Sequence, residues 1–532
     1  AHRAGGFWLV RRMKNLNRQS WPALAADLYA AAVLVWMPWY AGGYVQLTQE
    51  KLSAFLGVTL LAGLLLAVVA PEKMRATRWK QQGKAAVLYA AATLVSVLLS
   101  GNIVAALWAS GGYLGGLVLV AAALLGCMGT AVFLEDADSL ALPFMVSGAG
   151  VTLLGVVNNF GADPLGFRAV IEPSQYNLFF STIGNADYLS AYLCLWLPLA
   201  LHRFAAGKSA GERTAAFLCT ELGFFGMASL DSGLAALGLT GAAFILLLTV
   251  PLTAGELARY ALLAGGWAAA QLAMGVLSTR WPLLRTEHPF AALAQPLPAA
   301  AIIAVCLAAA ALWAECAKRN PSKTSLTAQR LCCVAAAMLT AALLVAVNGF
   351  GVSLGGLDNF LRVGPDWATG RGAIWADVWY CFTRGTPQQM LFGHGPGMVH
   401  AALAGLGDTL PFAAADTIGA HNEYLELLLT GGVVGLAAYL TFLVTVLYTA
   451  RQNLAADPQK CGWLFCALAY AVQAAFNNRV SAVYPVFLVL LGVLTAAPQQ
   501  GTKRRHGLVL AGLLLLAGGA GVGRLLLRYL FL

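Results

Sequence analysis

The sequence is short of charge. Of its 532 residues only 11% are Asp, Glu, Lys or Arg, whereas a soluble domain carries about 25%. Apolar residues make up 59%, and the mean hydropathy is +0.72. These values exclude a large soluble domain. They predict an all-α, polytopic membrane protein.

Familiar catalytic signatures are also missing. There is no HExxH, Walker loop or GxGxxG after a strand, which removes several classes of zinc hydrolase and nucleotide-binding enzyme. Ten cysteines are present, but none has CxxC or Cys/His ligand spacing, so we expect neither a disulfide framework nor a zinc site. Cys381 is the one cysteine in a long polar segment, and we expect it to be reachable from outside the membrane.

Long apolar runs are what the sequence has in abundance. A span needs roughly 20 apolar residues, and that rule gives about 14 transmembrane helices. We divide the chain into a basic cytoplasmic N-terminus (1–20), a transmembrane helical region (21–349), an extracytoplasmic loop (350–420) and a second transmembrane region (421–532). No internal repeat is visible, which counts against an inverted-repeat transporter.

The distribution of basic residues gives the orientation. The N-terminal RRMKNLNR and the loops EKMRATRWKQQGK, HRFAAGKSAGER and AKRNPSKTSLTAQR fall on one side, which the positive-inside rule makes cytoplasmic. The acidic LEDADS loop is the exception. The net charge of +10 therefore indicates a membrane topology and no nucleic-acid partner. The long loop then lies outside, and its Trp, Gly and Pro content predicts that it folds.

Arginines on the outer side run against this charge rule and need a reason. Arg371 lies in GRGAIWADVW, and Arg280 and Arg285 lie in STRWPLLRTEH. A forked guanidinium is the natural partner of a phosphate or diphosphate. The alternative is a solvated loop charge or an ion pair with Asp366, Asp377 or Glu287. We also assign Trp375, from the first of these motifs, to substrate binding.

The stretch HNEYLELLLTGGVVGL places a histidine and two carboxylates at the mouth of an apolar helix. His421 starts this helix, where the helix dipole disfavours imidazolium and leaves a neutral ring able to accept a proton. Glu423 and Glu426 share one helix face and could hold the ring or an acceptor, with Asn422 beside them. The alternative is that these residues only cap the helix.

Two further stretches carry polar groups on the outer side. In SQYNLFFSTIGNADYLSAYL, Asn185 and Asp187 stand at a helix start and suit either substrate binding or capping. In FGHGPG (Phe392–Gly397) the glycines predict a tight turn with exposed backbone amides. The outer loop shows no His or carboxylate cluster at ligand spacing, so we predict no metal and no cofactor.

Taken in order, STIGNADYLSAYL, GRGAIW, GHGPG and HNEYLELLLTGGVVGL resemble the O-antigen ligase and O-antigen polymerase family of C-type membrane glycosyltransferases. The resemblance implies transfer of a glycan from an undecaprenyl-diphosphate-linked donor to a glycan, lipid or protein acceptor. It implies an inverting, metal-independent reaction on the outer face of the bacterial cytoplasmic membrane, among membrane lipids. It also implies that His421 is the base and that Arg371 is the family's loop arginine.

One departure from the family pattern stands out. Where many members have Ser-Arg-Gly, this chain has Leu-Asp-Ser-Gly, with Ser232 in place of the arginine. Arg280, Arg285 or Arg479 are candidates to replace it. The sequence does not separate ligase, polymerase and protein glycan transferase. An alternative from another class is a lipid-linked glycan flippase or transporter, which would need charges deep in several spans, and Glu221 and Glu426 are the clearest.

Overall fold

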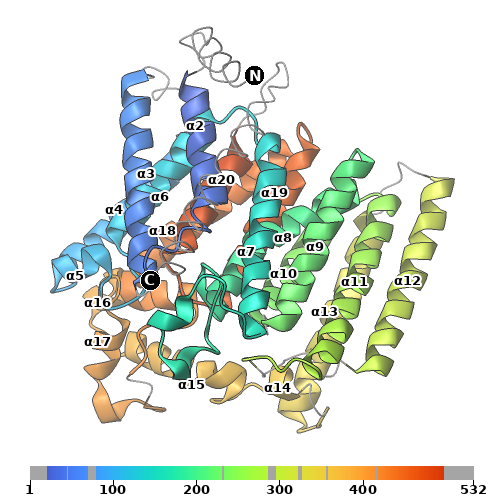
Figure 1. Cartoon of the computed structure of the whole chain (residues 1–532). Coiled ribbons are helices and arrows are strands. Elements are labelled where there is room, and N and C mark those ends of the chain that lie inside the picture. The colour runs from blue at the N-terminus through green and yellow to red at the C-terminus, as the bar shows by residue number, and fades with distance from the viewer. Residues whose placement is uncertain are drawn as a thin grey trace.

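A computed structural model describes residues 21–44, 46–69, 80–230, 233–285, 295–320, 326–354, 358–413 and 416–496. This part of the chain is built from helices (Figure 1), as the apolar runs predict. The described strands are β1 (Phe179–Phe180) and β2 (Gly184–Asn185), which pair antiparallel next to one helix. The basic N-terminus and the apolar run near residue 515, which we count among the transmembrane helices, lie outside the described residues.

Eight helices in the described part are long and apolar enough to cross a membrane. They are α3 (Leu47–Val69), α4 (Lys80–Leu99), α7 (Ala141–Asn159), α8 (Ala186–Ala206), α11 (Ala254–Ser278), α12 (Pro296–Arg319), α13 (Leu326–Gly349) and α18 (Glu423–Asn453). Shorter helices of the same bundle are α2 (Trp21–Ala31) with the π-helix η2 (Ala32–Trp36), α6 (Leu117–Phe133), α9 (Ala210–Ser229), α10 (Gly233–Thr249), α19 (Cys461–Gln473) and α20 (Tyr484–Thr495). The chain is therefore an all-α, multi-pass membrane protein.

Short helices fill the connections. They are α5 (Ile103–Trp108), η5 (Asp138–Leu140), η6 (Phe167–Val170), η7 (Pro173–Gln175), η11 (Pro458–Lys460) and η12 (Ala474–Phe476). Two of the apolar runs that we count as transmembrane helices, near residues 221 and 470, correspond to α9 and α19. The pattern of apolar runs thus located the helices well, although it did not show how short some of them are.

The centre and the edge of the bundle differ in burial. In α8, 89% of the apolar stretch is inside the protein, and its Trp196 packs among the fully buried side chains of the core. In α12 and α13 only 11% is inside, and these helices stand at one edge (Figure 1). Leu312 and Leu339 are 71% and 62% exposed there, a position that is stable only against lipid tails.

The long loop folds into a small helical layer at one end of the bundle (Figure 1). It contains α14 (Asp358–Leu361), α15 (Trp367–Thr383), α16 (Pro387–Phe392), α17 (Val399–Ala404) and η10 (Gly407–Thr409). Val378, Phe382 and Leu403 form a core with Leu429 of α18, so the prediction of a structured loop is confirmed. The expectation for Cys381 is wrong. Its thiol belongs to this core, lies 3.6 Å from the carbonyl oxygen of Ala402, and is only 4% exposed.

The glycine motifs join this layer to α18. Gly432 has φ +67 and interrupts α18, which leaves carbonyl groups of the preceding turn without helical partners. The backbone amides of His394 and Gly395 donate to Leu429 O (3.0 Å) and Thr430 O (2.9 Å). These two amides of the GHGPG turn are therefore engaged, whereas the sequence predicts that they are exposed. A broken helix inside a membrane protein is stable when other backbone groups satisfy it in this way.

Candidate active site

Three segments that are far apart in sequence meet where the helical layer covers the bundle. They are the start of α8, the start of α15 and the residues before α18. Arg371 of α15 and Asp187 of α8 form an ion pair, with 2.9 Å between Nη2 and Oδ2. The two side chains are 11% and 28% exposed, so the pair is only partly closed off from solvent.

Arg371 follows an unusual backbone turn. Ala368, Thr369 and Gly370 have φ of +52, +61 and +86, and the left-handed region costs about 1–2 kcal/mol for each non-glycine residue. Arg371 Nη1 donates to Ala368 O at 3.0 Å and so braces the turn. Strained turns of this kind concentrate at functional sites. In the same motif Gly372 is required, because a Cβ there would lie 1.9 Å from the carbonyl oxygen of Gly364.

Asp187 is placed by the N-terminus of α8. Asn185 is the N-cap of this helix, and its side-chain oxygen accepts from the amide of Asp187 at 2.8 Å. The carbonyl of Asp187 accepts in turn from Asn477 Nδ2 at 2.8 Å. A carboxylate in the first helical turn is stabilised by the helix dipole. Asn185 therefore acts as a cap, and Asp187 is the group it presents to Arg371.

His421 is held in a strained conformation just before α18. Its φ is +47, and its backbone N–H donates to Asn478 Oδ1 at 2.7 Å. The ring Nδ1 lies 3.3 Å from Asn478 Nδ2. Burial lowers the pKa of His421 below its usual value, the charge of Arg371 lowers it further, and Asp187 opposes this shift. The ring is therefore neutral at pH 7, as the sequence predicts, although burial and not the helix dipole is the leading cause.

The next two residues make contacts that hold α18 in place. Asn422 caps the helix, and its side-chain oxygen accepts from the amides of Tyr424 (3.1 Å) and Leu425 (3.0 Å). Glu423 is 1% exposed and receives two bonds from Arg479, from Nε at 3.0 Å and from Nη2 at 2.9 Å. The Arg479 guanidinium also lies over the rings of Tyr89, Tyr439 and Tyr484.

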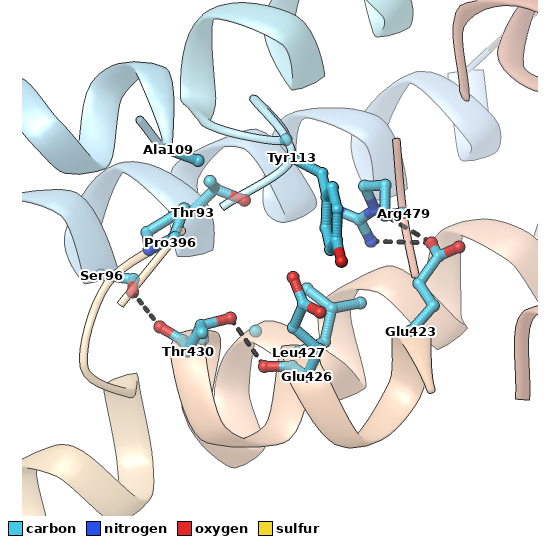
Figure 2. A pocket seen from close by; sticks show the side chains of 14 residues that line it. Thr93, Ser96, Ala109, Tyr113, Pro396, Glu423, Glu426, Leu427, Thr430 and Arg479 are labelled. Carbon is cyan, nitrogen blue, oxygen red and sulfur yellow. Dashed lines mark hydrogen bonds and ion pairs between the residues drawn. The ribbon is translucent and has the colours of Figure 1, made fainter. Parts of the chain in front are cut away.

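Glu426 faces a small internal cavity. Figure 2 shows its carboxylate near Tyr113, with the Arg479–Glu423 pair alongside. Glu426 Oε2 accepts from the amide of Ala420 at 3.2 Å and so ties the end of the loop to α18. The cavity measures about 30 Å³, which admits a water molecule but not a sugar ring. Among the described residues, no hydrogen bond or ion pair joins the Glu426 carboxylate to Arg371, Asp187 or His421.

Aromatic side chains flank Arg371. Trp375, one turn further along α15, lies with its ring centroid 5.5 Å from that of Trp367 and 6.0 Å from that of Phe476. All three rings are half-buried. Phe476 directly precedes Asn477, so this aromatic surface is continuous with the segment that binds Asp187. Half-exposed indole faces of this kind suit the apolar face of a sugar or a prenyl chain.

The structure does not bring the remaining arginines into this group. Arg280 is exposed on the loop after α11, and the backbone amide of Arg285 donates to Asn159 Oδ1 at 2.9 Å. In the described residues, no hydrogen bond or ion pair connects either side chain with Arg371, Asp187 or His421. Ser232, at the departure from the family pattern, lies outside the described residues. Arg479 is closed inside the protein by its partners.

Sequence reasoning missed Asn477, which contacts Asp187, and Asn478, which contacts His421. The available signal was the run FNNR between two apolar segments, where polar residues on the side of the long loop need partners. It also missed Tyr113, from the short loop after α5. Among the described residues, no group of three or more His, Cys, Asp or Glu side chains is arranged to hold a metal ion.

Comparison with known protein families now identifies this region. A family model described as O-antigen ligase matches residues 290–440. This part of the chain is therefore similar to the O-antigen ligase family. The match supports assignment to the O-antigen ligase and polymerase family. No curated protein matches the chain.

The family indicates glycan transfer in cell-envelope polysaccharide synthesis, with a lipid-linked glycan and an acceptor as general partners. The matched O-antigen ligase domain includes Arg371, Trp375 and His421. It does not include Asp187 or Asn478. The structure therefore adds the groups that meet this domain from α8 and from the α19–α20 connection.

Proposed function

We propose that this protein transfers a glycan from an undecaprenyl-diphosphate-linked donor to an acceptor on the outer face of the bacterial cytoplasmic membrane. The observation that carries the proposal is the meeting of Arg371, Asp187 and His421 at one half-buried site inside or beside an O-antigen ligase domain. A neutral imidazole and a forked guanidinium are the two groups that such a transfer needs.

The reaction balances with these groups alone. The acceptor hydroxyl oxygen attacks the anomeric carbon, its proton passes to His421, and the bond to the diphosphate oxygen breaks with both electrons on the leaving group. Attack opposite the leaving group inverts the anomer. Proton removal by a placed base supplies roughly 10²–10⁴-fold in rate. Arg371 faces the charge that grows on the diphosphate, where stabilisation acts on the transition state.

The charge pattern supports an outward-facing site. Arg203 at the end of α8, Arg319 at the end of α12 and Arg451 near the end of α18 all lie at the helix ends away from the long loop. The positive-inside rule makes that side cytoplasmic. The donor's sugar and lipid would then approach Arg371 from the outer leaflet, past Trp375. The same attack by an acceptor hydroxyl would serve for a glycan, lipid or protein acceptor.

The test is glycosidic bond formation by purified protein with a lipid-linked donor and defined acceptors. His421→Ala should lower turnover by about 10²–10⁴-fold, with donor binding nearly unchanged, because a base acts on the acceptor. Arg371→Ala should weaken donor binding as well. Turnover should survive EDTA, since the proposal assigns the leaving-group charge to arginine. His400→Ala and Arg362→Ala, in the same loop, are the matched controls.

Two results would reject the proposal. Wild-type turnover by His421→Ala would remove the base on which the proposed mechanism rests. Binding or translocation of the lipid-linked glycan without any new glycosidic bond would favour the flippase alternative. A requirement for Mg²⁺ or Mn²⁺, restored by adding the metal back, would instead overturn only the metal-independent mechanism.

A further inference from the structure

The side-chain amide of Asn478 contacts His421 at two points. Its Oδ1 accepts from the backbone N–H of His421 at 2.7 Å, and its Nδ2 lies 3.3 Å from the ring Nδ1. The first contact fixes the orientation of the amide, because exchanging O and N would set two N–H donors against each other. The Nδ2 group is therefore the one that faces the ring.

This orientation selects one tautomer of the neutral ring. An amide NH₂ only donates, so Nδ1 must offer a lone pair to it, and the ring proton then lies on Nε2. The opposite tautomer would point an N–H at the amide NH₂. The second hydrogen bond of an imidazole commonly sets its tautomer in this way. Here the contact is long and weak, so a substrate hydroxyl could take the place of the amide at Nδ1.

The segment that carries Asn478 is itself firmly anchored. The backbone N–H of Asn478 donates to Asn477 Oδ1 at 2.8 Å. Asn477 Nδ2 in turn donates to Gln473 Oε1 and to the backbone carbonyl of Asp187. Arg479 follows, locked to Glu423. The three consecutive residues 477–479 thus contact, in this order, the start of α8, His421 and the start of α18. Asn478 is 4% exposed, so its short hydrogen bond with the backbone N–H of His421 is shielded from solvent.

We propose that Asn478 is a positioning residue that holds His421 as the Nε2–H tautomer, so that Nδ1 is the nitrogen that receives the acceptor's proton. The acceptor hydroxyl displaces the Asn478 amide from Nδ1, its O–H proton moves to Nδ1 as the new C–O bond forms, and the diphosphate leaves with the electron pair. The Nε2–H remains in place throughout. This inference rests on the proposed role of His421 as the base.

The charged groups that act on His421 are Arg371 from α15 and Asp187 from α8. On α18, Glu426 accepts from the amide of Ala420, the residue before His421, and Glu423 is paired with Arg479. Asn478→Asp leaves this set intact and keeps an acceptor for the backbone N–H. Its second oxygen would accept from Nδ1–H, which moves the lone pair to Nε2. The added carboxylate would also raise the pKa of His421.

The experiment combines NMR with activity. In protein labelled with ¹⁵N-histidine, the signals lost in His421→Ala should show Nδ1 unprotonated and Nε2 protonated. Asn478→Asp should reverse this pattern, move the acidic limb of the rate profile to higher pH, and lower transfer at least tenfold at high pH. Asn102→Asp, at the exposed N-cap of α5, is the control and should change none of these readouts.

The outcomes separate this inference from the proposed function. A wild-type ring protonated on Nδ1, or an Asn478→Asp protein as active as wild type, would overturn the role given to Asn478 and make Nε2 the basic nitrogen. Wild-type turnover by His421→Ala would instead reject His421 as the base, while the tautomer signals would still report the Asn478 contact.

Discussion

Two arginine–carboxylate pairs lie in this region, and they differ in their surroundings. Arg479 and Glu423 are 7% and 1% exposed, share two hydrogen bonds, and are covered by three tyrosine rings. Arg371 and Asp187 are 11% and 28% exposed, share one, and lie beside a half-buried aromatic surface. The first pair has its charge satisfied inside the protein. The second keeps part of its charge available.

This contrast shows how the chain divides two tasks between similar side chains. A buried pair stabilises only when both partners stay in place, because removing one leaves an uncompensated charge. The Arg479–Glu423 pair fixes the start of α18 and, through Asn478, the position of His421. In the function we propose, Arg371 of the other pair exchanges Asp187 for a diphosphate oxygen. If this division is correct, breaking the Arg479–Glu423 pair should destabilise the protein far more than breaking the Arg371–Asp187 pair.

The largest effect on stability should come from breaking the Arg479–Glu423 ion pair. Arg479→Met leaves Glu423 charged and buried, which costs about 3–5 kcal/mol of folding free energy. Thermal unfolding of the purified protein in detergent measures this loss. The double variant Glu423→Leu/Arg479→Met should regain most of it, because no lone charge remains.

The double variant also provides the sharpest check on this idea. If it unfolds as easily as Arg479→Met alone, the loss comes from missing tyrosine contacts of the guanidinium and not from an unpaired carboxylate. The pair would then be a packing feature, and the contrast with Arg371–Asp187 would lose its electrostatic basis.

An intermediate effect is expected where α18 is interrupted. Gly432→Ala forces a side chain into φ +67 and places Cβ 2.3 Å from the backbone of Leu391, so we expect a loss of about 1–3 kcal/mol. Gly435→Ala is the matched control on the same helix, since nothing lies within 4 Å of its Cβ. It should stabilise slightly through helix propensity. Equal losses at both glycines in thermal unfolding would show that the interruption is not what joins the helical layer to α18.

Much of this arrangement could be predicted from the sequence. Apolar run length gave the helices, and the order of motifs led to Arg371, His421 and Asp187, which do meet. The roles of Glu423 and Asn422 could not be decided, because capping and catalysis use the same residue types at a helix start. Asn478 was missed because its role depends on contact with a residue 57 positions away. The exposure of the GHGPG amides was predicted wrongly, since their partners exist only where α18 breaks.

The smallest effect on stability is expected at the Arg371–Asp187 pair. The informative measurement there is the pH dependence of the transfer rate. Asp187→Asn removes one partly exposed partner of Arg371 and should cost about 1 kcal/mol or less. Asp187 is the group that raises the pKa of His421 against burial and Arg371, so its loss should lower that pKa further. Because the neutral ring accepts the proton, activity falls as the pH drops through this pKa, and the acidic limb of the variant should move to lower pH. The rate profile of Asp187→Asn, normalised to its own maximum, checks this against wild type. If the acidic limb stays in place or moves to higher pH, Asp187 does not act on the pKa of His421, and its role is limited to the ion pair with Arg371.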